Sequence, residues 1–317
     1  MNHVAWKGYA YGALAAASYG VNPLFGLPLY SREGMSPDAV LFYRYGLALL
    51  MLMVVMKLKG VPFGICRRQV LPLAGLGLLF AFSSLLLFDS YNYMDAGIAS
   101  TLLFIYPVLV AVIMAVCFKE RVSVLTAVSI AMAFSGIALL YRGEGGQTLS
   151  LTGVAMVFGS SLSYAVYMVA VNRSSLRQLP AVKLTFYSLL FGLLLFVVRL
   201  DFGASVPLIR HPLMWADVCC LAFFPTVVSL VAMAKAIHYI GSTPTAILGA
   251  LEPVTALFFG VAVFGEALTP RIVLGVLLVL TAVTLIIVAR PLLQTLGRVG
   301  KVKSLITYRK RRSGRYV

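Results

Sequence analysis

Long apolar stretches separated by short polar segments make up almost the whole chain. A helix needs about 20 apolar residues to cross the hydrocarbon core of a bilayer. Blocks of that length predict ten transmembrane helices, at residues 8–29, 38–57, 69–92, 96–117, 122–141, 151–171, 180–199, 214–238, 243–264 and 270–292. The connections between them are short, so the pattern predicts an all-α polytopic membrane protein without a soluble domain.

Composition agrees with this pattern. The 317 residues are 61% hydrophobic and 11% charged, whereas soluble domains have about 45–50% apolar and about 25% charged residues. The first block is longer than the apolar region of a signal peptide, so we interpret it as a retained helix.

The positive charges predict an orientation in the membrane. Most of the 26 Lys and Arg residues fall on the side that holds both termini. Loops rich in Lys and Arg stay in the cytoplasm, so we expect both termini to be cytoplasmic and the membrane to be the inner (plasma) membrane. Half of the net charge of +16 lies in the tail, residues 293–317. We expect this tail to contact anionic lipid rather than nucleic acid.

The chain also repeats itself. When residues 101–120 are aligned with residues 247–266, Pro107 matches Pro253 and Glu120 matches Glu266. Similar offsets align all five helices of residues 5–141 with those of residues 151–292. Because five is odd, the second half must enter the membrane from the opposite side. Such inverted repeats are typical of secondary transporters, which expose a central site to each side in turn.

These residues resemble the EamA-like exporters of the drug/metabolite transporter superfamily. The resemblance is carried by Pro107, Lys119, Glu120, Gly136, Leu251, Glu252, Pro253, Gly265 and Glu266. It implies a ten-helix bundle whose central cavity is lined by the first four helices of each half, with the fifth and tenth helices at the periphery. Members of the superfamily export amino acids, drugs, polyamines and other metabolites.

An ionisable group in the bilayer costs roughly 2.5–3.5 kcal/mol on insertion scales, so it is usually paired or functional. Glu252 lies within a predicted helix, directly before Pro253. It is a candidate for binding a substrate ammonium group or exchanging a proton, and the alternative is a structural carboxylate at the proline kink. Its counterpart in the first half is Tyr106, so the two halves differ chemically here.

Three further charged residues lie within predicted helices. Asp89 and Lys235 are repeat counterparts, and they are candidates for a gate, a substrate contact or a structural ion pair. Arg44 is a candidate anchor for a substrate carboxylate, unless its side chain extends to the membrane surface. Glu120 and Glu266 end their helices, and we expect them to hold loops, through Arg121 or Arg271, rather than to touch substrate.

Polar and aromatic side chains within the predicted helices are candidates for the cavity lining. They are Tyr19, Asn22, Ser83, Ser84, Tyr91, Asn92, Tyr106, Tyr164 and Tyr167. Asn22-Pro23 is predicted to interrupt the first helix, whose Gly8, Gly12, Ala16 and Gly20 form a face for close packing. Pro107 and Pro253 are candidate hinges for alternating access, and packing kinks are the alternative.

The sequence contains no motif of a known catalytic, phosphate-binding or metal-binding site. We therefore expect neither an enzyme nor a cofactor, and active transport would draw on a gradient. The function predicted is proton-coupled or facilitative export of small metabolites such as amino acids. The alternatives are a phosphorylated-metabolite, drug or polyamine transporter and, less favoured, a non-transporting membrane enzyme or lipid-handling protein.

Overall fold

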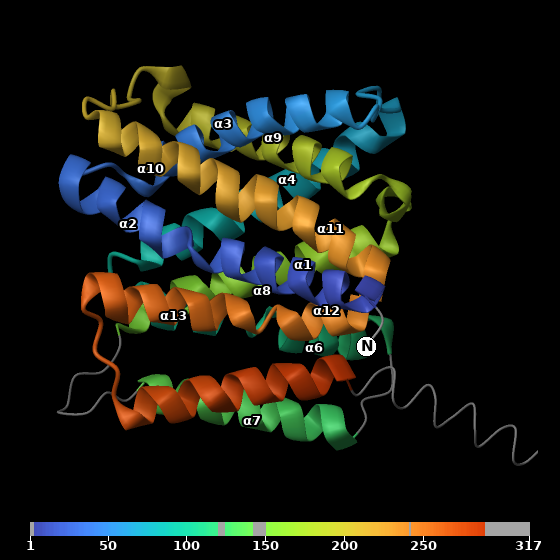
Figure 1. The fold of residues 1–317 in the computed structure, drawn as a ribbon, viewed down its shortest axis with the longest axis vertical. Coiled ribbons are helices and arrows are strands. Elements are labelled where there is room, and N and C mark those ends of the chain that lie inside the picture. The colour runs from blue at the N-terminus through green and yellow to red at the C-terminus, as the bar shows by residue number, and fades with distance from the viewer. Residues whose placement is uncertain (1–2, 120–123, 142–149, 241, 289–317) are drawn as a thin grey trace, which may run out of the picture.

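The computed structural model describes residues 3–119, 124–141, 150–240 and 242–288, and these residues form helices and no β-strand (Figure 1). Some predicted features, namely Glu120, Arg121 and the basic tail, lie outside the described residues. The helices are α1 (His3–Gly20), α2 (Asn22–Glu33), α3 (Pro37–Leu58), α4 (Arg67–Ser90), α5 (Ala96–Leu103), α6 (Tyr106–Phe118), α7 (Val124–Tyr141), α8 (Leu151–Arg173), α9 (Ala181–Arg199), α10 (Pro212–Ala222), α11 (Ser229–Ile240), α12 (Ser242–Leu248), α13 (Leu251–Phe264) and a last helix, Pro270–Val288.

Seven helical stretches are long and apolar enough to cross a membrane. They are Pro37–Leu58, Arg67–Ser90, Ala96–Phe118, Leu151–Val171, Ala181–Arg199, Pro212–Ile240 and Pro270–Val288. The other three predicted spans correspond to shorter or broken helices: α1 with α2, α7, and α12 with α13. The fold is thus that of an all-helical, multi-pass membrane protein.

Proline interrupts the first helix where the sequence predicted. Helix α1 ends at Gly20 and α2 begins at Asn22, with Pro23 in its first turn. Proline has no N–H group, so the carbonyl four residues before it, that of Tyr19, loses its helical partner. The Asn22 side chain donates to this carbonyl instead, with Nδ2 at 2.8 Å from the oxygen.

The predicted close-packing face of α1 is confirmed at its glycines. Helix α1 lies against α11, α12 and α13 (Figure 1). A Cβ atom on Gly8 or Gly12 would collide with side chains of α11 and α12. A Cβ atom on Gly20 would lie 2.4 Å from the backbone oxygen of Glu252 and 2.7 Å from Cβ of Thr255. The end of α1 therefore packs directly on the start of α13.

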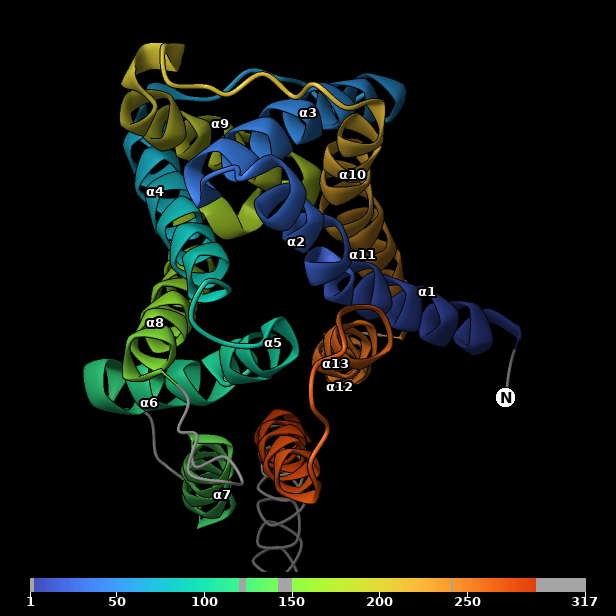
Figure 2. The ribbon, with the colours of Figure 1, turned by 90° about the vertical axis from the view of Figure 1, so that its left-hand side faces the viewer.

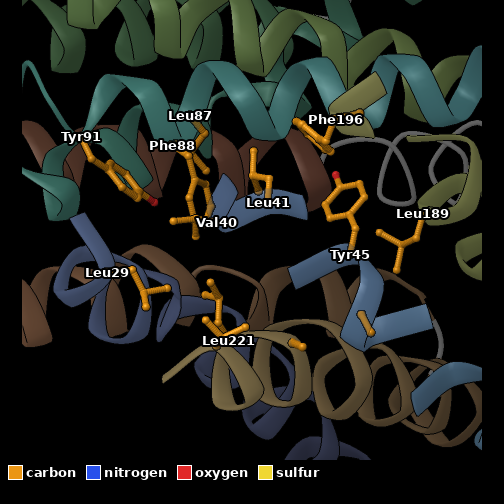
Figure 3. Close-up of a cluster of buried hydrophobic side chains, with 14 of the residues drawn as sticks. Leu29, Val40, Leu41, Tyr45, Leu87, Phe88, Tyr91, Leu189, Phe196 and Leu221 are labelled. Atoms are coloured by element: carbon orange, nitrogen blue, oxygen red, sulfur yellow. The ribbon is translucent and has the colours of Figure 1, made fainter. Parts of the chain in front are cut away.

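The main hydrophobic core lies between α2, α3, α4, α9 and α10 (Figure 3). Its fully buried side chains include Leu41, Tyr45, Phe88 and Phe196, and Tyr45 bonds the Ser84 hydroxyl at 2.8 Å. Helix α7 and the last helix pack on each other at the bottom of Figure 2. The two helices pack closely at Gly136 and Gly275. A Cβ atom added at Gly136 would lie 2.9 Å from the Gly275 carbonyl oxygen.

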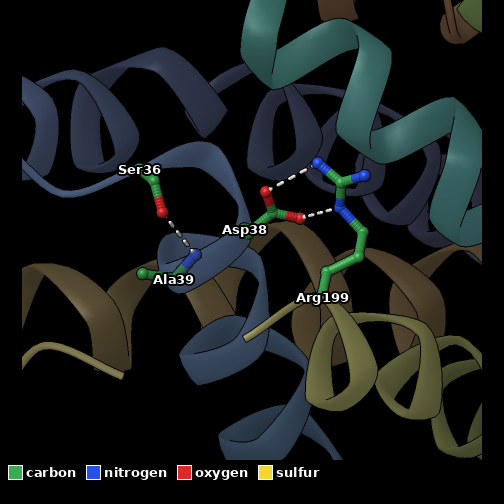
Figure 4. Close-up of polar contacts among 4 residues, drawn as sticks. All are labelled: Ser36, Asp38, Ala39 and Arg199. Atoms are coloured by element: carbon green, nitrogen blue, oxygen red, sulfur yellow. Dashed lines mark hydrogen bonds and ion pairs between the residues drawn. The ribbon is translucent and has the colours of Figure 1, made fainter. Parts of the chain in front are cut away.

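A polar contact joins the two halves at the start of α3 (Figure 4). Ser36 is the N-cap of α3 and accepts a hydrogen bond from the Ala39 amide at 3.3 Å. Arg199, at the end of α9, donates to both carboxylate oxygens of Asp38, at 2.6 and 3.0 Å. Because the Arg199 side chain is half-exposed, this pair sets geometry more than it adds stability.

Substitution of Gly20 by Ala tests the packing of α1 on α13. The added methyl group meets backbone, which cannot move aside as a flexible side chain can. We expect a loss of about 1–3 kcal/mol in stability, measured as a lower melting temperature of the purified protein. The matched control is Gly46→Ala, since nothing lies within 4 Å of a Cβ atom at Gly46. Equal melting temperatures for the two variants would contradict this packing.

Candidate functional site

The fourth helix of each half is broken at equivalent positions. In the first half α5 ends at Leu103 and α6 begins at Tyr106, directly before Pro107. In the second half α12 ends at Leu248 and α13 begins at Leu251, directly before Glu252 and Pro253. The two candidate hinge prolines thus occupy the first turn after each break. Movement about them stays a prediction.

The carbonyls that these prolines leave without a helical partner are both bonded. A residue with an N–H group at position 107 would donate to the Leu103 carbonyl, but Pro107 has none. The hydroxyl of Ser161 on α8 donates to the Leu103 oxygen instead, at 3.0 Å. Pro253 likewise cannot donate to the Gly249 carbonyl. That oxygen accepts the Glu252 amide instead, at 2.9 Å, in a tighter turn. Inside a membrane such replacements are required, because no water is present to satisfy freed backbone groups.

The two breaks place Tyr106 and Glu252 among other tyrosines. Tyr19, Tyr91, Tyr106 and Tyr164 each interact electrostatically with the Glu252 carboxylate. Glu252 is enclosed by protein yet keeps partial exposure to solvent, as do Tyr19, Tyr106 and Tyr164. We call Tyr19, Arg44, Tyr91, Tyr106, Tyr164 and Glu252 the central cluster.

Aromatic rings make up one wall of the central cluster. The rings of Tyr106 and Tyr164 meet edge to face, with centroids 4.7 Å apart. Tyr164 is also stacked on Tyr167 at 5.8 Å and lies 6.2 Å from the Phe80 ring. Rings arranged in this way offer both π faces and hydroxyl groups to a bound solute.

Arg44 belongs to the interior and does not extend to the membrane surface. Its side chain is 4% exposed, and its guanidinium lies 5.4 Å from the centre of the Phe88 ring. Among the described residues its electrostatic partners are phenols, namely those of Tyr19, Tyr30 and Tyr91. Arg44 and Glu252, both among the described residues, do not form an ion pair with each other.

Three polar atoms in or beside the central cluster lack hydrogen-bond partners among the described residues. They are Oδ1 of Asn22 and the hydroxyls of Tyr30 and Tyr91. Unbonded buried polar atoms are costly, so they are candidates for contact with a bound molecule or water. Asn22 was predicted as a site residue. Tyr30 was missed because it lies one residue beyond the first predicted helix, where the apolar pattern ends.

The hypothesis that Asp89 and Lys235 meet is wrong. Asp89, near the end of α4, accepts from Asn92 at 3.3 Å and interacts with Tyr30 of α2. Lys235 lies 4.8 Å from the centre of the Tyr11 ring of α1. Tyr11 and Tyr30 are nineteen residues apart on one interrupted helix, which at 1.5 Å per residue is roughly 28 Å. Both residues lie toward the ends of their membrane-spanning stretches, Asp89 in that of α4 and Lys235 in that of α10 and α11.

The expected pairing of Glu266 with Arg271 is also wrong. The Arg271 guanidinium donates to the carbonyl oxygen of Leu139 at 3.1 Å. The Glu266 carboxylate instead accepts from backbone amides at the start of α5. The pattern of charges along the sequence pointed to a side-chain partner, whereas the actual partners are main-chain groups.

Broken helices and buried charges in an all-helical bundle are typical of membrane transport proteins. The sequence profile of the EamA-like transporter family matches residues 6–142 and again residues 151–288. The chain belongs to the EamA-like transporter family, as the resemblance predicted.

Known proteins agree with this assignment. The chain is 26% identical over 268 residues to "Uncharacterized transporter YyaM" of Bacillus subtilis, which covers 82% of this chain and 87% of that protein. It is 30% identical over 221 residues to "Uncharacterized transporter sll1319" of Synechocystis, covering 67% of this chain and 65% of the relative. A solved crystal structure with 16% identity superposes with a TM-score of 0.64, over 90% of this chain and 98% of that one, which supports the fold alone.

Removal of the Ser161 hydroxyl tests how the break in the fourth helix is stabilised. We expect Ser161→Ala to lower stability by about 1–2 kcal/mol, because it leaves the Leu103 carbonyl unbonded. The control is Ser135→Ala, since the exposed Ser135 hydroxyl bonds the Ala131 carbonyl of its own helix. Melting temperatures in detergent compare the two, and a Ser161 variant as stable as its control would refute this role.

Proposed function

We propose that this protein is a secondary transporter that exports small zwitterionic metabolites, such as amino acids, across the inner membrane by alternating access. It is built from ten transmembrane helices in two inverted five-helix repeats, with both termini in the cytoplasm. Family membership supports transport, and the excess of Lys and Arg in the loops on the side of the termini supports this orientation.

The equivalent breaks in the two halves support the repeat. Each half carries its break in its fourth helix, followed at once by Tyr106-Pro107 or Glu252-Pro253. Discontinuous helices at corresponding positions of two halves mark the substrate site in many transporters. The site proposed here is the central cluster, which lies at these breaks.

The substrate class is inferred from two opposite charges that both interact with Tyr19. Arg44 and Glu252 both act on the Tyr19 phenol, yet they do not pair with each other. A guanidinium binds a carboxylate strongly, and a carboxylate beside tyrosine faces binds an ammonium group. A solute with both groups would satisfy Arg44 and Glu252 together.

The alternative substrates fit this arrangement less well. A phosphorylated solute favours several cations, but Arg44 is the one cation among the residues that act on the central cluster in the described chain. Lys183, the other buried cation among the described residues, donates to the backbone oxygen of Gly64. A polyamine would satisfy Glu252 and the tyrosines but would meet repulsion from Arg44.

The variant Glu252→Gln tests the proposed function. It keeps the shape of the side chain but removes the charge that would bind an ammonium group or exchange a proton. We expect uptake or release of radiolabelled amino acids by proteoliposomes to fall at least about tenfold, the cost of about 1.4 kcal/mol. The control is Asp201→Asn, an exposed carboxylate in the segment after α9. Normal transport by a folded Glu252→Gln protein at every pH would contradict the role of Glu252.

A further inference from the structure

Glu266 forms a contact between the two broken helices. It follows α13, and its carboxylate accepts the amide of Ala96 at 2.8 Å and that of Gly97 at 3.1 Å. These amides open α5 and have no partner within that helix. Asp95 stands at the N-cap position of α5 but makes no side-chain cap bond. The carboxylate of the second half thus caps a helix of the first half.

The backbone around Glu266 is shaped for this contact. Gly265 ends α13 in the left-handed region, with φ of 69°, and the Glu266 amide bonds the Gly260 carbonyl at 3.0 Å. A left-handed glycine directly after a helix ends it and turns the chain away. A Cβ atom added at Gly260 would lie 2.1 Å from the Glu266 carboxylate, and one added at Gly97 would lie 2.7 Å from it. Two glycines therefore leave the space that the carboxylate occupies.

The contact joins the two broken helices at one end of the bundle, which we call the closed end. Helices α5 and α13 pack closely, and a Cβ atom on Gly97 would come within 2.9 Å of Cα of Leu257. The counterpart helices, α6 and α12, make no comparable contact within the described residues, and Figure 2 shows them apart. In the proposed orientation, the closed end faces away from the cytoplasm.

The charges around Glu266 disfavour an ionised carboxylate. Asp95, in the turn before α5, repels the Glu266 carboxylate. Arg271, the next cation along the chain, donates to the Leu139 carbonyl instead of pairing with Glu266. Burial and, to a lesser extent, the Asp95 charge raise the pKa of Glu266 to about 7, against the opposing effect of the two amides. Burial also raises the pKa of Asp95.

We propose that Glu266 is a proton-binding site that links closure of this end to proton uptake. Glu266 takes up a proton when α5 and α13 meet and releases it when they separate. This inference rests on the proposed function in one respect: alternating access is what makes separation and contact of α5 and α13 two states of a transport cycle.

The sign of the pH dependence follows from the two states. In the open state the Glu266 carboxylate would be in water, with the ordinary pKa of 4.5, whereas the pKa in the closed state is about 7. The state with the higher pKa binds protons more tightly, so acid favours closure. Between pH 7 and pH 4.5 the ratio of closed to open protein should rise up to about tenfold per pH unit, and less where solvent screens the site.

Distance measurements between spin labels test the proposal on the full-length protein. Labels are attached at Tyr93→Cys and Leu268→Cys, two exposed positions flanking the contact, after Cys66, Cys117, Cys219 and Cys220 are replaced by Ser. Double electron–electron resonance in lipid nanodiscs is recorded from pH 5 to pH 9. We expect the short-distance population to grow as the pH falls.

Variants separate this role from a structural one. Glu266→Gln resembles the protonated acid, so it should stay closed at every pH. Asp95→Asn removes the repulsion, so it should be more closed than the parent above pH 7 and respond less to pH. Asp201→Asn, with its carboxylate in the segment after α9, should respond as the parent does.

Two results would overturn the proposal: opening as the pH falls, or an unchanged pH response in a monodisperse Glu266→Gln protein. The readout needs no substrate, so its failure is distinguishable from a failure of the transport assay on Glu252.

Discussion

The constraint on which the structure depends is that a freed backbone carbonyl in a membrane must find a partner inside the protein. Three prolines that free such carbonyls stand at helix breaks, namely Pro23, Pro107 and Pro253, and each of these carbonyls is satisfied differently. The Asn22 side chain bonds the Tyr19 oxygen, the Ser161 hydroxyl bonds the Leu103 oxygen and the Glu252 amide bonds the Gly249 oxygen. Because these solutions are local, the helices can be interrupted where polar side chains are needed.

The interruptions explain how the central cluster is assembled. Tyr19 stands just before the first break, and Tyr106 and Glu252 stand just after the breaks in the two fourth helices. Glycine at position 20 lets the first and last of these breaks approach, since its Cβ position is taken by Glu252 backbone. The same architecture that costs helical hydrogen bonds thus brings a buried cation, a carboxylate and several phenols together.

Much of this was predictable from the sequence, and the failures have physical causes. Apolar block length located the helices, and proline located the breaks, because both act through local chemistry. The family pattern located Glu252 and Glu266, but their partners lie on helices far apart in the chain. Asp89 and Lys235 align in the repeat yet bond elsewhere. Ser161 and Tyr30 gave no distinctive signal, since their roles arise from packing alone.

The central claim is that Arg44 and Glu252 together recognise a zwitterion. Its most direct test is to measure, by isothermal titration calorimetry, the binding of three matched ligands to the purified protein. These ligands are an amino acid, the amine that lacks its carboxylate and the acid that lacks its ammonium group. Our account predicts that each truncated ligand binds at least about tenfold more weakly, a difference of about 1.4 kcal/mol. Equal affinity for the amine or the acid would contradict it.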